Sequence, residues 1–201
     1  MMLITGGARS GKSGLAERFA ARHGERVLYI ATSVITDAEM AERIAHHRDS
    51  RPASWLTHEG YADLDQVIRE AAGRCDAVML ECITTLITNL LFAEAGDTDP
   101  EQMDFVAIEA AISRQIDALI AACEATPVPV YLVTNEVGFD IVPENRLARH
   151  FRDIAGRINQ RLAARASEVW LVISGIEWQL KGPGVRSLQG EAGQSSTGAP
   201  Q

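Results

Sequence analysis

Apolar residues follow two patterns along the chain. In the first pattern, a short run is apolar at almost every position. Such runs are typical of strands buried on both faces, as in a parallel sheet that is covered by helices. The predicted strands span residues 3–5, 27–31, 77–80, 128–134 and 169–173.

Between these runs, apolar residues recur every three or four positions, which is the period of an amphipathic helix. The predicted helices span residues 13–22, 36 to about 48, 64–71, 99–123 and 143–162. A capping box of Thr36 and Glu39 opens the second helix. Asp99 and Pro100 are expected to open the fourth, whose apolar stripe includes Val106.

Strands that alternate with helices predict an α/β fold of three layers, with a mostly parallel sheet covered by helices on both faces. The chain has 201 residues, of which 46% are hydrophobic, and this is enough for one core. We expect a single domain over residues 1–181. The last stretch, GPGVRSLQGEAGQSSTGAPQ, has little to bury, so residues 182–201 are predicted to form a disordered tail.

Composition and charge argue against several classes of function. The formal net charge of −8 disfavours sequence-independent binding of DNA or RNA. Cys75, Cys82 and Cys123 follow no metal-binding or disulfide spacing and suit a reducing compartment. No apolar run approaches the ~20 residues of a membrane-spanning helix, and the N-terminus does not resemble a signal peptide. We therefore expect a cytoplasmic protein without a membrane span and without a nucleic-acid partner.

The motif GGARSGKS lies between the first predicted strand and the first predicted helix, as a phosphate-binding loop requires. Its glycines let backbone N–H groups surround phosphate oxygens, and the helix N-terminus adds partial positive charge. Lys12 is suited to the β- and γ-phosphates, and the Ser13 hydroxyl is suited to Mg²⁺. The alternative is a chance glycine-rich turn. The predicted nucleotide-binding residues of this loop are Gly6, Gly7, Ala8, Arg9, Ser10, Gly11, Lys12 and Ser13; for Arg9, contact with phosphate and exposure to water are equally compatible with the sequence.

Glu81 follows a buried predicted strand, and a phosphate loop normally needs an acid at such a place to hold Mg²⁺. The alternative is a solvated acid at a strand end. Asn135 and Glu136 end another predicted strand, and ligands of open α/β sheets bind at the carboxyl ends of strands. These residues are therefore expected near the phosphate loop.

Two adjacent histidines, His46 and His47, end the helix that the capping box opens. At ~100° per residue, His47 falls on the side of Met40 and Ile44, whereas His46 falls on the polar side. His47 is then expected to be packed and His46 to be available. A neutral imidazole is a competent nucleophile toward phosphorus, although a histidine on a helix is more often structural or solvated.

Six segments in order resemble one enzyme family over residues 2–180: MLITGGARSGKS, VLYIATS, DAEMAERIAHHRDSRPASW, LECITTLITNLLF, LVTNEVGFDIVPENRLARHFRDIAGRINQRLA and EVWLVISGI. The family is the bifunctional adenosylcobinamide kinase / adenosylcobinamide-phosphate guanylyltransferase of cobalamin biosynthesis. The phosphate loop carries less of this resemblance than two longer segments do, RIAHHRDSRP and NEVGFDIVPENRLARHFRDIAGRINQ. The resemblance implies the fold class of P-loop NTPases.

The resemblance implies two reactions. The first phosphorylates the aminopropanol hydroxyl of adenosylcobinamide with ATP or GTP. The second transfers GMP from GTP to the resulting phosphate through a guanylylated His46, which gives adenosylcobinamide-GDP and pyrophosphate. It also implies a homotrimer with sites near subunit contacts, so that the arginine-rich helix over residues 146–165 either faces a neighbour or is a solvated face. Further implied nucleotide contacts are Ser33, Val34, Ile35, Arg51, Pro52, Ala53, Ser54, Glu59 and Thr84.

Two other functions fit the residues alone. A plain small-metabolite kinase would transfer the γ-phosphate and form no covalent nucleotide, with both histidines structural. A regulatory nucleotide-binding switch would hydrolyse its nucleotide slowly and bind a partner, with no small-molecule acceptor.

Overall fold

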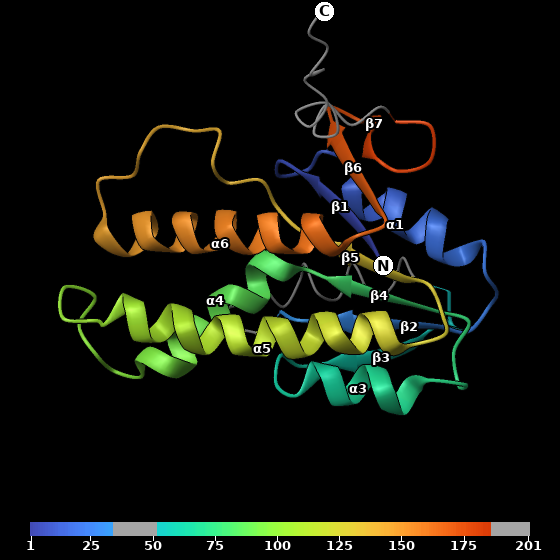
Figure 1. Cartoon of the computed structure of the whole chain (residues 1–201), viewed down its shortest axis with the longest axis horizontal. Coiled ribbons are helices and arrows are strands. Elements are labelled where there is room, and N and C mark those ends of the chain that lie inside the picture. The colour runs from blue at the N-terminus through green and yellow to red at the C-terminus, as the bar shows by residue number, and fades with distance from the viewer. Residues whose placement is uncertain (34–51, 186–201) are drawn as a thin grey trace, which may run out of the picture.

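Seven strands form one sheet in the computed structural model, which describes residues 1–33 and 52–185 (Figure 1). The strands are β1 (Met2–Gly6), β2 (Val27–Ala31), β3 (Leu56–Glu59), β4 (Ala77–Glu81), β5 (Val130–Val133), β6 (Glu168–Ile173) and β7 (Ile176–Lys181). Their order across the sheet is β3-β2-β4-β5-β1-β6-β7, and every pair is parallel except β6 with β7. The carboxyl ends of β1 to β6 therefore meet at one edge.

Alternate residues of the strands face opposite sides of the sheet, and each side has its own core. The described helices are α1 (Lys12–Ala21), α3 (Leu64–Ala71), α4 (Ile83–Ala95), α5 (Phe105–Ala125) and α6 (Arg146–Arg165). Buried residues of α1 pack with one set of strand residues, and those of α3 to α6 pack with the other set. The predicted three-layer α/β fold is confirmed.

Arginines of α6 pair with acids of α5 within the same chain. Arg157 donates to Glu109 through two nitrogens, at 2.5 and 2.7 Å, and Arg165 donates to Glu124 at 2.8 and 2.5 Å. Arg161 forms an ion pair with Asp117. These partly exposed pairs run along the two helices and help to fix how they lie against each other.

Three described elements lie outside the predicted ones: β3, α4 and β7. The helix α4, ITTLITNLLFAEA, is buried at seven of its 13 positions, and its apolar residues recur every three or four positions. The strand β3 has only four residues, and none of its side chains is buried. The strand β3 therefore has too little alternation to be predicted, whereas the helical period of α4 was present in the sequence and was missed.

Two predicted helix starts were wrong. Asp99 accepts a hydrogen bond from Glu101 N in a turn, whereas α5 begins at Phe105, where Asp104 accepts from two backbone N–H groups at 3.1 Å. Val106 is consequently in the first turn and 82% exposed, not in the core. In α6, Asn145 is the N-cap rather than a residue at Pro143. The capping box at 36–39 and its helix lie outside the described residues.

Candidate nucleotide-binding and active site

The phosphate loop connects the end of β1 to the start of α1, as predicted. Gly6 lies so close to β6 that a Cβ there would be 2.3 Å from the carbonyl oxygen of Val172. Gly11 has φ 99°, a left-handed conformation that favours glycine. From the other side, Gly175 N in the β6–β7 turn donates to Ser10 O at 2.9 Å. The loop is therefore braced by the neighbouring hairpin.

Lys12 is 7% exposed, and its Nζ donates to Gly7 O across the loop at 3.0 Å. Burial lowers the pKa of this ammonium below its ordinary value, while the nearby Cys82 and Glu81 oppose that shift. A cation that already spans the loop can exchange one carbonyl bond for bonds to phosphate oxygens without a large movement of its stem.

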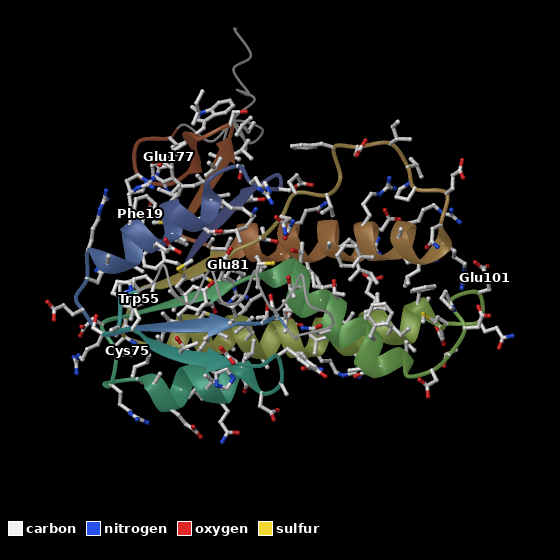
Figure 2. The ribbon with its side chains drawn as sticks, turned by 180° about the vertical axis from the view of Figure 1, so that it is seen from behind. Phe19, Trp55, Cys75, Glu81, Glu101 and Glu177 are labelled. Carbon is white, nitrogen blue, oxygen red and sulfur yellow. The ribbon has the colours of Figure 1, made fainter. Side chains whose placement is uncertain are left out.

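The two residues that the sequence assigns to a metal, Ser13 and Glu81, are in contact. Ser13 Oγ donates to Glu81 Oε1. Tyr29 OH donates to the other carboxylate oxygen, Oε2, at 3.1 Å. Figure 2 shows Glu81 near the middle of the molecule, beside the N-terminal ends of α1 and α4. A hydroxyl and a carboxylate oxygen side by side at a phosphate loop are suitable ligands for Mg²⁺.

Sequence reasoning missed Tyr29 and Thr32, which fix the end of β4. Thr32 is fully buried; its Oγ1 donates to Cys82 O at 2.9 Å and accepts from Cys82 N at 3.0 Å. Asn89 Nδ2 donates to Thr32 O at 2.5 Å. The polar residue directly after the apolar run of β2 is the signal that was available.

Thr84, an implied nucleotide contact, is buried in the first turn of α4. Asn135 Nδ2 donates to Thr84 Oγ1 at 2.6 Å. Asn159 of α6 in turn accepts from Thr134 Oγ1 at 2.8 Å and donates to Asn135 O at 3.1 Å. The end of β5 is thus held between α4 and α6. Glu136 N donates to Gly6 O at 3.1 Å, so this strand end lies near the phosphate loop, as expected.

The remaining predicted residues are only partly described. Ser33 follows β2 and Glu59 ends β3, where it is level with Ala31 of β2 and, across β2, with Glu81. Arg9 is exposed on the loop. An exposed turn before β3 contains Pro52, Ala53 and Ser54. The predicted residues Val34, Ile35, His46, His47 and Arg51 lie outside the described part of the chain.

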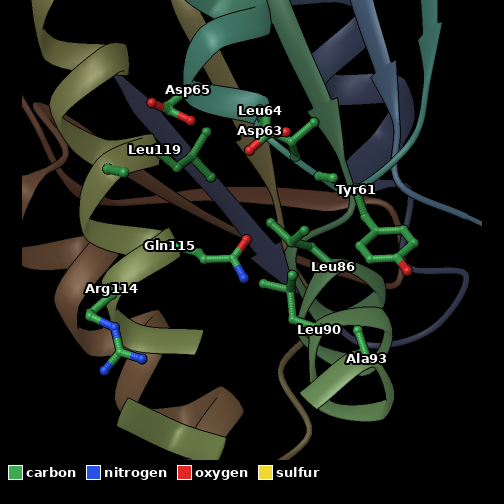
Figure 3. Close-up of a pocket in the computed structure, with 12 residues that line it drawn as sticks. Tyr61, Asp63, Leu64, Asp65, Leu86, Leu90, Ala93, Arg114, Gln115 and Leu119 are labelled. Atoms are coloured by element: carbon green, nitrogen blue, oxygen red, sulfur yellow. The ribbon is translucent and has the colours of Figure 1, made fainter. Parts of the chain in front are cut away.

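A separate pocket of about 490 Å³ lies between α3, α4 and α5 (Figure 3). Leu86 and Leu90 of α4 form one wall, and Arg114 and Gln115 of α5 form the other. Among the described residues that line it, none belongs to the predicted site. The phosphate loop, rather than this pocket, therefore marks the candidate site.

None of the helices in the described ranges 1–33 and 52–185 is long and apolar enough to cross a membrane.

Comparisons with known proteins show the family to which the chain belongs. A family model described as cobinamide kinase / cobinamide phosphate guanyltransferase matches residues 2–180. The bifunctional adenosylcobalamin biosynthesis protein CobU of Salmonella typhimurium is 61% identical over 181 residues, covering 90% of this chain and 99% of the relative. The Escherichia coli protein of the same name is 58% identical with the same coverage.

A solved ATPase from a bacterial type III secretion system has the same fold, with a TM-score of 0.55 at 9% identity, over 85% of this chain and 50% of that chain. This likeness concerns the fold alone. The family match spans nearly all of the described domain and includes the phosphate loop, Glu81 and Asn135. The chain belongs to the cobinamide kinase / cobinamide phosphate guanyltransferase family and is a bifunctional kinase and guanylyltransferase of adenosylcobalamin biosynthesis.

Proposed function

We propose that both reactions use the phosphate loop at residues 6–13 and that GMP is carried on His46. The acceptor of the kinase step is the aminopropanol hydroxyl of adenosylcobinamide, and the donor is ATP or GTP. In the second step adenosylcobinamide phosphate accepts GMP from GTP. The observation that carries the proposal is the contact between Ser13 and Glu81 beside the buried Lys12.

In the kinase step the acceptor oxygen forms a bond to the γ-phosphorus while the bond to the leaving nucleoside diphosphate breaks. The hydroxyl must lie in line with that bond, so most of the protein's contribution is positioning and charge stabilisation. Lys12 neutralises the β- and γ-phosphate oxygens. Backbone N–H groups between Gly6 and Ser13 donate to the same oxygens, and the bracing of the loop by Gly175 keeps them aligned.

The donor set at Ser13 and Glu81 fits Mg²⁺. This ion prefers oxygen ligands, keeps several waters and needs few protein ligands when phosphates are present. Within the described residues no cluster of three or more His, Cys, Asp and Glu side chains forms a richer metal site. When bound here, Mg²⁺ would neutralise charge that develops on the phosphates. Ser13 and Glu81 would hold it, and Tyr29 would orient Glu81.

For the guanylyl step, an imidazole nitrogen of His46 forms a bond to the α-phosphorus of GTP and pyrophosphate leaves. A phosphate oxygen of the corrinoid substrate then attacks the same phosphorus and releases the histidine. The phosphate loop can stabilise the departing pyrophosphate with the same groups that it uses in the kinase step. The family resemblance and the position of His46 on the polar side of its predicted helix support this assignment.

A direct test is incubation with GTP labelled on the α-phosphate, followed by denaturation and mass spectrometry. We expect label on the protein in the absence of any corrinoid, at the mass of GMP. The absence of label on the protein, or an unlabelled mass increase of one phosphoryl group in place of GMP, would contradict a covalent GMP intermediate while leaving the kinase assignment intact.

Replacing Glu81 by glutamine keeps its size and removes the charge that would hold Mg²⁺. We expect turnover to fall and the Mg²⁺ concentration for half-maximal activity to rise about 10- to 100-fold. The binding of Mn²⁺ with nucleotide, followed by electron paramagnetic resonance, reports the same change without turnover. An unchanged metal dependence would move the ligand role to another acid, with Glu59 and Glu136 as the next candidates.

Two buried tyrosines provide a matched control for this metal assignment. Tyr29 and Tyr131 lie on the α1 side of the sheet, and each hydroxyl is hydrogen-bonded, to Glu81 and to His23 respectively. We expect Tyr29→Phe to weaken metal affinity about 2- to 10-fold, since one hydrogen bond that orients the carboxylate is lost. Tyr131→Phe should leave metal affinity unchanged. Equal metal dependence in both variants would show that Tyr29 does not orient a metal ligand.

The homotrimer implied by the resemblance stays a proposal. Light scattering coupled to size exclusion of the full chain measures it, and a mass of three chains is expected.

A further inference from the structure

Large apolar side chains are exposed on two segments beside the phosphate loop. In the connection between β5 and α6, Phe139 is 83% exposed, Ile141 87% and Val142 59%. In the β6–β7 hairpin, Ile173 is 54% exposed, Ile176 72% and Trp178 65%. We call these six residues the apolar rim. Three of them lie within four positions of the connection and three within six positions of the hairpin, and such grouped apolar residues mark a binding surface more often than those scattered singly.

Both segments of the apolar rim are joined to the phosphate loop by backbone hydrogen bonds. Glu136 N, at the start of the β5–α6 connection, donates to Gly6 O at 3.1 Å. In the hairpin turn, Gly175 N donates to Ser10 O at 2.9 Å. Figures 1 and 2 show the connection running above α6 and the hairpin beside α1, both on the upper side of the molecule. The phosphate loop therefore lies between the bases of the two segments.

The other exposed large apolar residues among those described lie on segments for which no hydrogen bond to the phosphate loop is seen or, in the case of Leu180, at the opposite edge of the sheet. Leu56 begins β3 and Leu180 is near the end of the antiparallel β7, so both belong to the opposite edge of the sheet. Phe92 is in the last turns of α4, which runs away from its N-cap at Cys82. Val106 is in the first turn of α5. Within the described ranges, only the rim residues combine large exposed apolar side chains with a place, at the phosphate-loop edge of the sheet, on segments whose backbone is hydrogen-bonded to the phosphate loop.

Local bonds hold the rim residues outward. Glu136 Oε1 accepts from Gly138 N at 3.0 Å, and Asp140 Oδ1 accepts from Ile141 N at 2.7 Å. At the far end, Arg149 Nη1 donates to Pro143 O at 3.1 Å. These bonds fix the backbone on both sides of Phe139 and Ile141 without burying their side chains. These hydrogen bonds give the connection a defined backbone conformation.

We propose that the apolar rim binds the corrinoid macrocycle of the substrate and so presents the aminopropanol arm to the phosphate loop. A corrin ring carries many methyl groups on its faces and edge, and such a surface matches exposed Phe, Ile, Val and Trp side chains. An alkylcobalt(III) corrinoid with neutral amide side chains is a cation. The connection over residues 136–145 carries Glu136, Asp140 and Glu144 and no lysine or arginine, so its charge is complementary.

Geometry favours this occupant because the acceptor hydroxyl must come within about 3–3.5 Å of the phosphorus. The macrocycle must then lie no farther from the phosphate loop than the length of the aminopropanol arm that carries the hydroxyl. The inference rests on the proposed use of this loop by both reactions. A second copy of the chain is the other occupant that an apolar surface of this kind could bind, and the experiment separates the two.

The test compares Phe139→Ser/Ile141→Ser and Trp178→Ala with Val106→Ser, an equally exposed apolar residue away from the loop. For each rim variant we expect KM for cobinamide, and Kd for cobinamide from equilibrium dialysis followed by corrin absorbance, to rise about tenfold or more. KM for ATP should not change. Formation of the protein–GMP adduct from GTP alone needs no corrinoid and should keep the wild-type rate. Val106→Ser should match the wild type in all four measurements.

Unchanged cobinamide affinity in both rim variants would overturn the proposal. A change in molecular mass by light scattering would also overturn it, because the rim would then be a contact between subunits. Failure of the phosphate-loop assignment is recognised separately, since Lys12→Ala would then retain activity whatever the rim variants do.

Discussion

Lys12→Ala is expected to lose both kinase and guanylyltransferase activity, each by about 10²- to 10³-fold or more. Both reactions need the triphosphate oxygens neutralised, and Lys12 is the cation that spans the phosphate loop. The fold is expected to survive, because the side chain contributes one hydrogen bond to a loop carbonyl and its burial lowers the pKa of the ammonium rather than stabilising its charge. The two activities are measured separately, as γ-phosphate transfer to cobinamide and as GMP transfer to cobinamide phosphate.

The sequence contains one other lysine, Lys181, and it provides the control. Its Nζ donates to Ala163 O and Ala164 O at the end of α6, away from the phosphate loop. Lys181→Ala removes the same charge, so we expect both activities to remain while Tm falls slightly. Wild-type kinase turnover in Lys12→Ala would show that the loop does not bind the phosphates.

His46→Ala is expected to abolish the covalent GMP adduct and guanylyl transfer, while kinase activity with ATP persists at least in part. In the proposed mechanism only the second reaction passes through a nucleotide that is covalently attached to the protein, so the two activities should separate in this variant. The adduct should be labile in acid and fairly stable in base, as a phosphoramidate is and a serine phosphodiester is not. Mass spectrometry after treatment with GTP measures the adduct.

His47→Ala is the matched variant, since the neighbouring residue loses the same imidazole. Its projected place beside Met40 and Ile44 predicts a lower free energy of unfolding with the adduct retained. An adduct that persists in His46→Ala and disappears in His47→Ala would reverse the assignment of the two histidines. The absence of an adduct in every variant and in the wild type would contradict a covalent guanylyl intermediate and leave only the kinase reaction as proposed.

The parts of the site that could be predicted from the sequence depend on local patterns. The phosphate loop is one continuous motif, and its glycines, lysine and serine act through their own backbone and the helix that follows. Its chemistry can therefore be predicted from the sequence without knowledge of the fold. The position of Glu81 could also be predicted, because an apolar run that stops at an acid indicates a buried strand that ends at the sheet edge. Parallel pairing then brings Glu81 to the same edge as Ser13, and the structure confirms that these two side chains meet.

Other parts depend on partners that are distant in sequence. Tyr29 and Thr32 orient Glu81 and Cys82 from 50 or more positions away. The polar Thr32 directly after the apolar run of β2 indicates a strand end near the site, but nothing in the local pattern indicates which residues it bonds. The same is true of Asn159, which holds the end of β5 from the middle of α6. A polar residue on a mostly polar helix has no distinctive period, and only the packing of α6 on the sheet shows that it is buried.

The sequence by itself determined the α/β class, the phosphate loop, the acid at the end of β4 and, through the family resemblance, the pair of reactions. Each of these is carried by residues close together in the chain or by a period within one element. The tertiary structure alone decided the order of the strands and the placing of the apolar rim beside the phosphate loop. The exposure of a side chain depends on the elements that pack around it. Phe139 and Trp178 are as apolar as core residues, and only the folded structure shows that none of the described elements covers them.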